Sequence, residues 1–292
     1  MIDTLQDRPP SAVDNLFERS ILDVGIPPCP VILERFMTEM RKDEPDYNRL
    51  SGIIGADVGL SAGLIKTANS PYFGMRQRAR SVNDALAVLG LKMASHTVAG
   101  IILRKVFPNV PNLERFWDAS ARIARLSGWL AQYLDIRGLR ADDAYTFGLF
   151  RDCGIPVLLG RFPHYEKLLA AANRDAERSF IGVEETELPT NHAMVGSMLA
   201  QNWWLPEEIC LAIRNHHDLM ALESANSNLP MLSRRLIATA QLAEHIVQQQ
   251  LGLSLTQEWP KLGPACLQIL DMHEEQLEAL YAEATPIAAL TE

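Results

Sequence analysis

Apolar residues recur every three or four positions along nearly the whole chain, which is the spacing of one face of an α-helix. Leu33, Phe36, Met37 and Met40 form one such stripe, and a break at residues 43–45 ends it. No segment shows the regular alternation of apolar and polar residues that a half-buried strand requires. The pattern therefore predicts an all-α fold, with its longer helices at about 91–106, 114–134, 142–151, 190–203, 206–217, 230–251 and 263–282.

Short motifs mark where helices begin and where they are interrupted. Ser81 and Asp84 have the S-x-x-D spacing of a capping box, which predicts a helix start at this point. Pro108 and Pro111 separate a front half of short helices from a back half of longer ones. Residues 173–189 are polar and interrupted, and we expect them to form a loop between two helices.

Composition narrows the class of protein. With 48% hydrophobic residues among 292, the chain can bury a large core, and its formal net charge of −9 argues against non-specific nucleic-acid binding, which needs a basic face. No apolar run approaches the roughly 20 residues of a membrane span, and the first ten residues do not resemble a signal peptide. The four cysteines are far apart in sequence. We therefore expect a cytoplasmic protein with free thiols and no membrane association.

Four segments form motifs in a fixed order. The sequence IPPCP occupies residues 26–30, ANSPYFG occupies 68–74, GLFRDCGI occupies 148–155, and WWLPEEICLAIRNHH occupies 203–217. Together they resemble the bacterial HDOD family, the HD-related output domains, over about residues 21–250. The third segment is similar to the motif of the HD superfamily of metal-dependent phosphohydrolases, with Arg151 in place of its histidine.

The resemblance implies a domain organisation. It implies an all-α, multi-helix HD-like domain with an N-terminal helical subdomain, of the HDOD type. We predict an N-terminal extension at 1–20, the N-terminal helical subdomain at 21–110, the HD-like helical subdomain at 111–252 and a C-terminal helical extension at 253–292.

The resemblance also implies a set of metal ligands, most of which this chain lacks. A catalytic HD site needs a histidine, the His-Asp pair and a later aspartate, and these positions fall on Ala119, Arg151, Asp152 and Gln241. Alanine has no donor atom, and a guanidinium is always charged and only donates hydrogen bonds, so neither binds a cation. We therefore expect no cofactor, with a divalent metal such as iron, manganese or zinc as the alternative. Arg151, or another nearby cation, is predicted to balance the charge of Asp152 without an ion.

The remaining polar residues define a candidate pocket, made of Arg151, Asp152, His192, His216 and Gln241. Neighbouring residues on a helix point about 100° apart, so we expect at most one of His216 and His217 to face inward. Alternatively, these histidines close a helix C-terminus, where an imidazolium bonds free carbonyl groups.

Three functions are compatible with this set of residues. The leading hypothesis is a non-catalytic signal-transduction or regulatory module that binds a signalling protein partner or a nucleotide-like signalling ligand. One alternative is a metal-dependent phosphohydrolase acting on nucleotides or cyclic dinucleotides. The other is a metal-free nucleotide sensor, in which the planar guanidinium of Arg151 holds a phosphate.

Overall fold

The described part of the chain folds entirely into helices, as the apolar pattern predicts. The structure is a computed structural model that describes residues 26–70, 78–107, 113–223, 228–253 and 255–289, and these contain no strand. Its helices are α2 (Val31–Met40), α3 (Tyr47–Gly55), α4 (Val58–Ala68), α5 (Val82–Val106), α6 (Leu113–Tyr133), α7 (Ala141–Phe150), α8 (Gly154–Arg161), α9 (Tyr165–Arg174), α10 (Phe180–Glu184), α11 (His192–Asn202), α12 (Glu207–Asn215), α13 (Leu219–Glu223), α14 (Met231–Leu251), α15 (Glu258–Ile269) and α16 (Glu275–Ala288).

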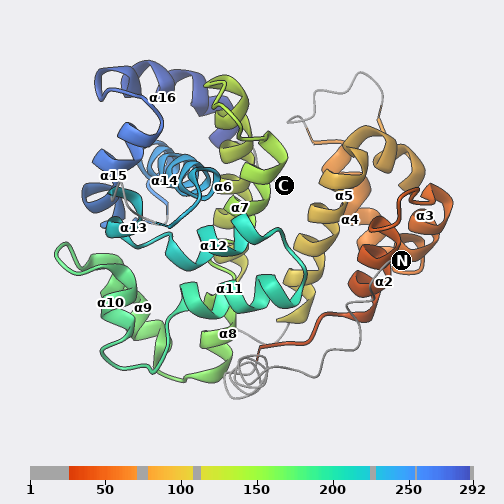
Figure 1. The fold of residues 1–292 in the computed structure, drawn as a ribbon, viewed down its shortest axis with the longest axis horizontal. Coiled ribbons are helices and arrows are strands. Elements are labelled where there is room, and N and C mark those ends of the chain that lie inside the picture. Colours follow the sequence, from red (N-terminus) through yellow and green to blue (C-terminus); the bar gives the residue numbers. More distant parts are fainter. Residues whose placement is uncertain (1–25, 71–77, 108–112, 224–227, 254, 290–292) are drawn as a thin grey trace, which may run out of the picture.

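Helices α2 to α5 form one side of the molecule in Figure 1. Asp46 caps α3 and Asp57 caps α4 by accepting backbone N–H bonds, so these short helices begin at defined points. Ser81 and Asp84 make the reciprocal bonds of a capping box, which confirms the predicted start of α5. The buried stripe on α2, which includes Leu33 and Phe36, packs with α3 and α5.

Helix α5 is bent at Gly90, whose φ of 70° belongs to the left-handed region that favours glycine. By length and composition alone, α5 is the one helix in the described ranges that could cross a membrane. However, 67% of its most apolar window is buried inside the protein, and its C-terminal part packs against α4 and α7. Its apolar character is thus explained by its place in the core.

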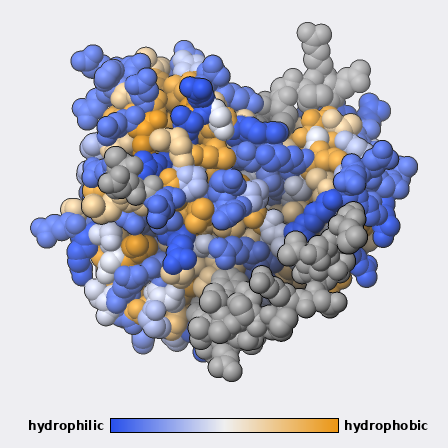
Figure 2. All heavy atoms as spheres, in the orientation of Figure 1, coloured by the Kyte–Doolittle hydropathy of each residue, from blue (hydrophilic) through white to orange (hydrophobic). Residues whose placement is uncertain are grey.

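The other side of the molecule is built around α6, α7 and α14, which pack against one another (Figure 1). Helix α12 packs on both α7 and α14, while α11 lies against α12 and α8. Helices α15 and α16 cover α14 from the C-terminal end of the chain. On the face drawn in Figure 2, hydrophilic residues are interspersed with apolar ones. The turn between α7 and α8 therefore joins a helix that packs on α6, α12 and α14 to one that packs on α11.

Two predicted elements were wrong in detail. The expected helix at 263–282 is two helices, α15 and α16, because Asp271 takes a left-handed backbone conformation with φ of 54° between them. The expected loop at 173–189 contains the short helix α10, which Ser179 caps. Of the ANSPYFG motif, residues 71–74 lie outside the described part of the chain, whereas Asn69 exchanges two hydrogen bonds with the backbone of Ala79.

Candidate metal centre

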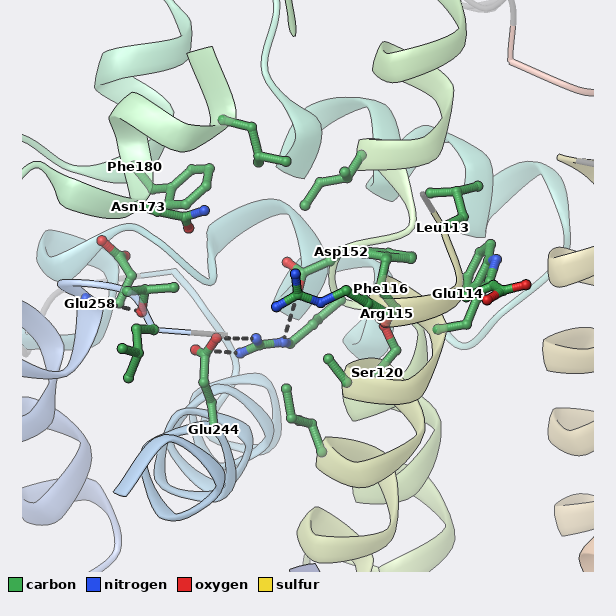
Figure 3. Close-up of a pocket in the computed structure, with 18 of the residues that line it drawn as sticks. Leu113, Glu114, Arg115, Phe116, Ser120, Asp152, Asn173, Phe180, Glu244 and Glu258 are labelled. Atoms are coloured by element: carbon green, nitrogen blue, oxygen red, sulfur yellow. Dashed lines mark hydrogen bonds and ion pairs between the residues drawn. The ribbon is translucent and has the colours of Figure 1, made fainter. Parts of the chain in front are cut away.

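Arg151 and Asp152 lie in the turn that joins α7 to α8, and their side chains form an ion pair. The Nε atom of Arg151 is 3.0 Å from Oδ2 of Asp152. The other two guanidinium nitrogens contact Glu244 on α14, with Nη2–Oε1 and Nη1–Oε2 distances of 2.8 and 3.0 Å (Figure 3). Arg151 is only 5% exposed. The charge of Arg151 is therefore shared between two carboxylates. The pairing with Asp152 was predicted from the sequence, and the pairing with Glu244 was not.

Three histidine rings converge on the opposite oxygen of Asp152. His192 is the first residue of α11, and His216 and His217 directly follow α12. The Nε2 atom of His192 is 3.3 Å from Nε2 of His216 and 3.2 Å from Nε2 of His217. Oδ1 of Asp152 is 3.2 Å from Nε2 of His216 and 3.6 Å from Nε2 of His192. One donor atom from each of these four residues lies within 4.8 Å of the others.

The other ring nitrogen of each histidine is bound to an acceptor outside this cluster. Nδ1 of His192 is 2.8 Å from Oε2 of Glu184, and Nδ1 of His216 is 2.6 Å from the carbonyl oxygen of Ile213. Nδ1 of His217 is hydrogen-bonded to Glu258 of α15. A carboxylate or carbonyl oxygen only accepts, so each Nδ1 donates a proton outward from the cluster. Nε2 of His216 also faces a carboxylate oxygen, Oδ1 of Asp152.

A second layer of contacts fixes these acceptors and rings. The hydroxyl of Tyr165 donates to Glu184, which also accepts the backbone N–H of His192 at 3.1 Å. Lys261 pairs with Glu258 at 2.6 Å. The ring of Phe180 stacks on His217 with a centroid distance of 4.8 Å. The rings are thereby held in one orientation, which is how proteins position metal-binding histidines.

Burial and charge move the pKa values of this cluster in opposite directions. Burial alone raises the pKa of Asp152, but the Arg151 charge and a bond from His216 bring it well below its ordinary value. Burial lowers the pKa of His192, yet the adjacent Glu184 raises it above the usual range. The pKa of His217 is lowered by burial and by the two neighbouring imidazoles.

Close helix packing places His192 against the Arg151–Asp152 turn. A Cβ atom built on Gly154 would lie 2.1 Å from the carbonyl oxygen of His192 and 2.7 Å from the backbone nitrogen of Gly196. Only glycine at position 154 allows α8 and α11 to approach this closely.

A cavity of about 1150 Å³ opens beside the cluster. Asp152, His217, Glu244 and Glu258 line it, and Figure 3 shows several of them. Ala119 lines the same cavity. The position that the HD resemblance assigns to the first histidine therefore does face the site, and alanine offers no ligand there.

The structure brings together four of the five residues predicted for the pocket. Arg151, Asp152, His192 and His216 are in contact. The buried amide of Gln241 has no hydrogen-bond partner in the described part of the chain, and Glu244, one turn further along α14, binds Arg151 instead.

The expectation that only one of His216 and His217 faces inward was wrong. Helix α12 ends at Asn215, so the two histidines lie in a turn where helical angles no longer apply. The alternative reading holds in part, because His216 is the C-cap residue of α12 and bonds the free carbonyl of Ile213.

The donor set fits one divalent cation. Three imidazole nitrogens and a carboxylate oxygen are ligands typical of zinc and iron. It does not fit a second ion, since Ala119 has no donor atom and Arg151 places a positive charge beside Asp152.

Comparisons with known proteins agree with this architecture. The family model of the HDOD domain matches residues 26–219. An uncharacterised protein from Treponema pallidum (strain Nichols) is 27% identical over 197 residues, which are 66% of this chain and 38% of that protein. The chain thus spans well under half the length of this relative.

Two solved structures share the fold. An HDOD domain protein of unknown function from Geobacter sulfurreducens is 21% identical, with a TM-score of 0.67 and coverage of 94% of this chain and 95% of that one. A protein from Shewanella amazonensis SB2B named "putative phosphohydrolase" is 18% identical, with a TM-score of 0.69 and coverage of 93% and 95%. At these identities the likeness establishes the fold alone.

Proposed function

The chain belongs to the HDOD domain family, and on that premise we propose that it is a regulatory module of signal transduction that does not hydrolyse phosphoesters. It acts by binding a signalling protein or a small signalling ligand. The observation that carries this proposal is the position of Arg151, held between Asp152 and Glu244.

Hydrolysis of a phosphoester by a metal centre requires an ion with a free position for water, which becomes the attacking hydroxide. The guanidinium of Arg151 lies next to Asp152, at the position that the resemblance gives to a metal-binding histidine. It repels a second cation there and gives it no lone pair. The ligands that remain number four, which is the count of a closed, structural zinc site.

The cavity beside Asp152 supports the binding part of the proposal. Its walls include the aromatic rings of Phe116, Trp117 and Phe180, together with Arg115. Aromatic walls with a few polar groups are typical of small-molecule sites. The alternative in which Arg151 itself holds a phosphate is disfavoured, because all three of its nitrogens already face carboxylates.

The test compares the wild-type protein with Asp152→Ala in the presence of manganese, iron or zinc. The substrates are bis-p-nitrophenyl phosphate, nucleoside triphosphates and cyclic dinucleotides. We expect no turnover in the wild type above that of the variant. Metal-dependent turnover that Asp152→Ala abolishes would overturn the proposal.

Ligand binding is tested separately with Ala119→Trp, which places a large ring in the cavity wall. Thermal unfolding is measured with the same nucleotides. A ligand that stabilises the wild type and not the variant binds in the cavity. Equal stabilisation of both proteins would place the ligand elsewhere and remove the cavity from the proposal.

A further inference from the structure

We propose that residues 91–106 of α5 connect the N-terminal helices α2 to α4 with the turn that carries Arg151 and Asp152. A shift of α4 against α5 reaches α7 through a row of contacts, and α7 ends at this turn. The inference deepens the proposed function and rests on it in one respect, since a regulatory module needs a route from the part that receives a signal to the site that responds.

One side of this segment meets α7 at intervals of one helical turn. Three pairs of residues make the contacts: Lys92–Asp143, with 2.7 Å between Nζ and Oδ1, His96–Thr146, with 2.5 Å between Nδ1 and Oγ1, and Gly100–Leu149, where a Cβ built on the glycine would overlap Cδ2 of the leucine. Positions 92, 96 and 100 are four apart, so they lie on one side of α5, and their partners follow in the same order along α7. The two helices therefore run side by side in the same direction.

The buried hydrogen bond between His96 and Thr146 fixes the two helices along their axes. Oγ1 of Thr146 also lies 2.7 Å from the carbonyl oxygen of Asp142, which can only accept, so the hydroxyl proton goes there and Nδ1 of His96 donates to Thr146. Both side chains are buried. A slide of α5 along α7 would break a bond between two buried groups, which is costly, so the helices move together.

A second side of the same segment meets α4. Ile101 packs against Gly63, where a Cβ would lie 2.8 Å from Cδ1 of the isoleucine. Lys105 pairs at 2.6 Å with Asp57, the N-cap residue of α4. Positions 101 and 105 lie about 100° around the helix from the side that meets α7. The segment is thus held between α4 and α7, and because a close-packed interior transmits small displacements, a shift of α4 moves both.

Gly90 gives this segment a hinge. Its φ of 70° and ψ of 162° are non-helical and form a combination that is essentially restricted to glycine. The bend separates residues 91–106 from the first turns of α5, which the capping box of Ser81 and Asp84 holds. A few residues of this kind absorb the backbone changes of a hinge motion. The segment can therefore tilt while the capped start of α5 stays in place.

A second connection leads from the N-terminal helices to α11. The guanidinium of Arg41, which follows α2, lies 4.7 Å from the ring centroid of Trp204. The Nδ2 atom of Asn202 donates to the carbonyl oxygen of Pro27 at 3.3 Å. Asn202 ends α11, and His192 begins it. The N-terminal part of the protein therefore contacts two helices, α7 and α11, that each position a residue of the candidate metal centre.

The experiment measures amide hydrogen exchange in the whole 292-residue chain after chelator treatment, so its outcome does not depend on a bound ion. The reporters are the turn amides of Arg151, Cys153 and Ile155, which donate to backbone carbonyl oxygens at 2.8, 2.9 and 2.9 Å. Gly63→Ala presses on Ile101 from α4 and lies outside α7. We expect exchange at the three amides to rise about 2- to 30-fold, with α16 unchanged. Unchanged exchange at the turn would overturn the inference, and so would an equal rise in α16.

A size exchange between α5 and α7 tests the contact itself. Gly100→Ala places a methyl group against Leu149, and Leu149→Val removes the atom that this methyl group meets. We expect Gly100→Ala to speed exchange at the turn and the double variant to return toward the wild-type rate. Additive effects of the two changes would contradict a contact that transmits position. Gly52→Ala is the matched control, because a Cβ there has no atom within 4 Å.

Co²⁺, the spectroscopic substitute for zinc, reports on the candidate metal centre itself. It is titrated into the same variants while its visible absorption is recorded. We expect weaker binding in Gly100→Ala than in the wild type and recovery in the double variant, because Asp152 lies just beyond the end of α7. The same Co²⁺ affinity in all of these proteins would overturn the link between α5 and the centre.

The two proposals fail separately. Phosphoester turnover, together with a turn that responds to Gly63→Ala, removes the proposed function and leaves the connection intact. Absence of turnover with an unresponsive turn does the reverse.

Discussion

Arg151 and Glu244 lie 93 residues apart in the sequence and meet as a bidentate pair, with two nitrogen–oxygen distances of 2.8 and 3.0 Å in the protein interior. Two parallel charge-assisted contacts of this kind are specific to arginine, because a lysine presents a single ammonium group. The pair fixes the α7–α8 turn to α14 and so sets the position of Asp152.

Removing this arginine should destabilise the protein strongly. Arg151→Ala leaves Glu244, which is buried, and Asp152, which is half-buried, without their arginine partner, which costs roughly 3–5 kcal/mol of unfolding free energy. Urea denaturation measures the loss. The control is Arg140→Gln, because Arg140 is 67% exposed where it pairs with Asp142 and should matter by about 0–1 kcal/mol. Equally small losses of unfolding free energy in both variants would show that the buried pair stabilises the protein no more than the exposed one.

Replacing the same arginine by a metal ligand should change the metal count. Arg151→His removes the positive charge and adds an imidazole between Asp152 and Glu244, so we expect a second ion to bind under excess zinc or manganese. Elemental analysis after gel filtration gives the stoichiometry. Arg151→Lys, which keeps the charge, should stay at one ion. If Arg151→Lys also gains a second ion, repulsion by the guanidinium is not what excludes it.

Adding a methyl group at the contact between α8 and α11 should disturb the cluster. In Gly154→Ala the new Cβ would lie 2.1 Å from the carbonyl oxygen of His192, so α11 must shift. We expect a loss of about 1–3 kcal/mol or more, with weaker Co²⁺ binding. Gly52→Ala is the control, since a Cβ there has no atom within 4 Å and lies inside α3. It should leave Co²⁺ binding unchanged and stabilise slightly, by up to ~1 kcal/mol.

His96 should make stability depend on pH, away from the candidate metal centre. Burial lowers the pKa of His96 to about 4, against opposing effects of Asp143 and Asp142, while Lys92 lowers it further. Because the folded state disfavours the proton, this contribution is full above the unfolded pKa of 6.5 and is lost as the pH falls to about 4. The difference in unfolding free energy between wild type and His96→Gln should therefore shrink by ~3 kcal/mol between pH 6.5 and pH 4. A difference that is constant with pH would contradict the lowered pKa.

Metal removal should loosen α15 before the rest of the fold. Coordination of Nε2 of His217 makes its Nδ1 proton a stronger donor to Glu258, the first residue of α15. Stripping the ion should speed amide hydrogen exchange over residues 258–269, and adding zinc back should restore protection. Helix α3 lies in the other half of the molecule and serves as the internal control. Uniform acceleration across both helices would indicate global loosening in place of a specific link.

The local pattern predicted the fold well because helix formation here follows short-range rules. The capping box of Ser81 and Asp84, and the helix at 231–251, appear where the sequence places them. The break at Asp271 was missed, since a single residue in the left-handed conformation leaves the apolar periodicity almost unchanged. The boundaries predicted for the subdomains stay a prediction.

The candidate site was predicted only in part. Arg151, Asp152 and His216 lie in segments that resemble the family's motifs, and His192 was predicted to join them in the pocket. His217 was lost to the assumption that α12 continues beyond Asn215. Glu184, Glu244 and Glu258 carry no local mark, because a glutamate that will be buried beside a histidine looks the same in sequence as one on a solvated helix face.

The residues that the resemblance assigns as metal ligands are mostly absent, whereas the structure brings together a different set, Asp152 with three histidines. Counting Ala119, Arg151 and Gln241 as absent ligands led to the expectation of no metal, and that expectation is untested. The convergence of three imidazoles depends on tertiary contacts such as that of Gly154 with α11, which motif positions do not describe.

The two carboxylates that complete this centre, Glu244 and Glu258, both come from beyond residue 219, where the family match ends. The unit that is recognisable by descent is therefore shorter than the unit that folds. A fragment trimmed to the recognisable boundary would leave Arg151 with Asp152 as its remaining carboxylate partner and His217 without its hydrogen bond to Glu258. Its failure in an expression trial would say nothing about the intact molecule. For the same reason, exchanging the segment after residue 219 between family members would transplant the supports of the centre while keeping its ligands.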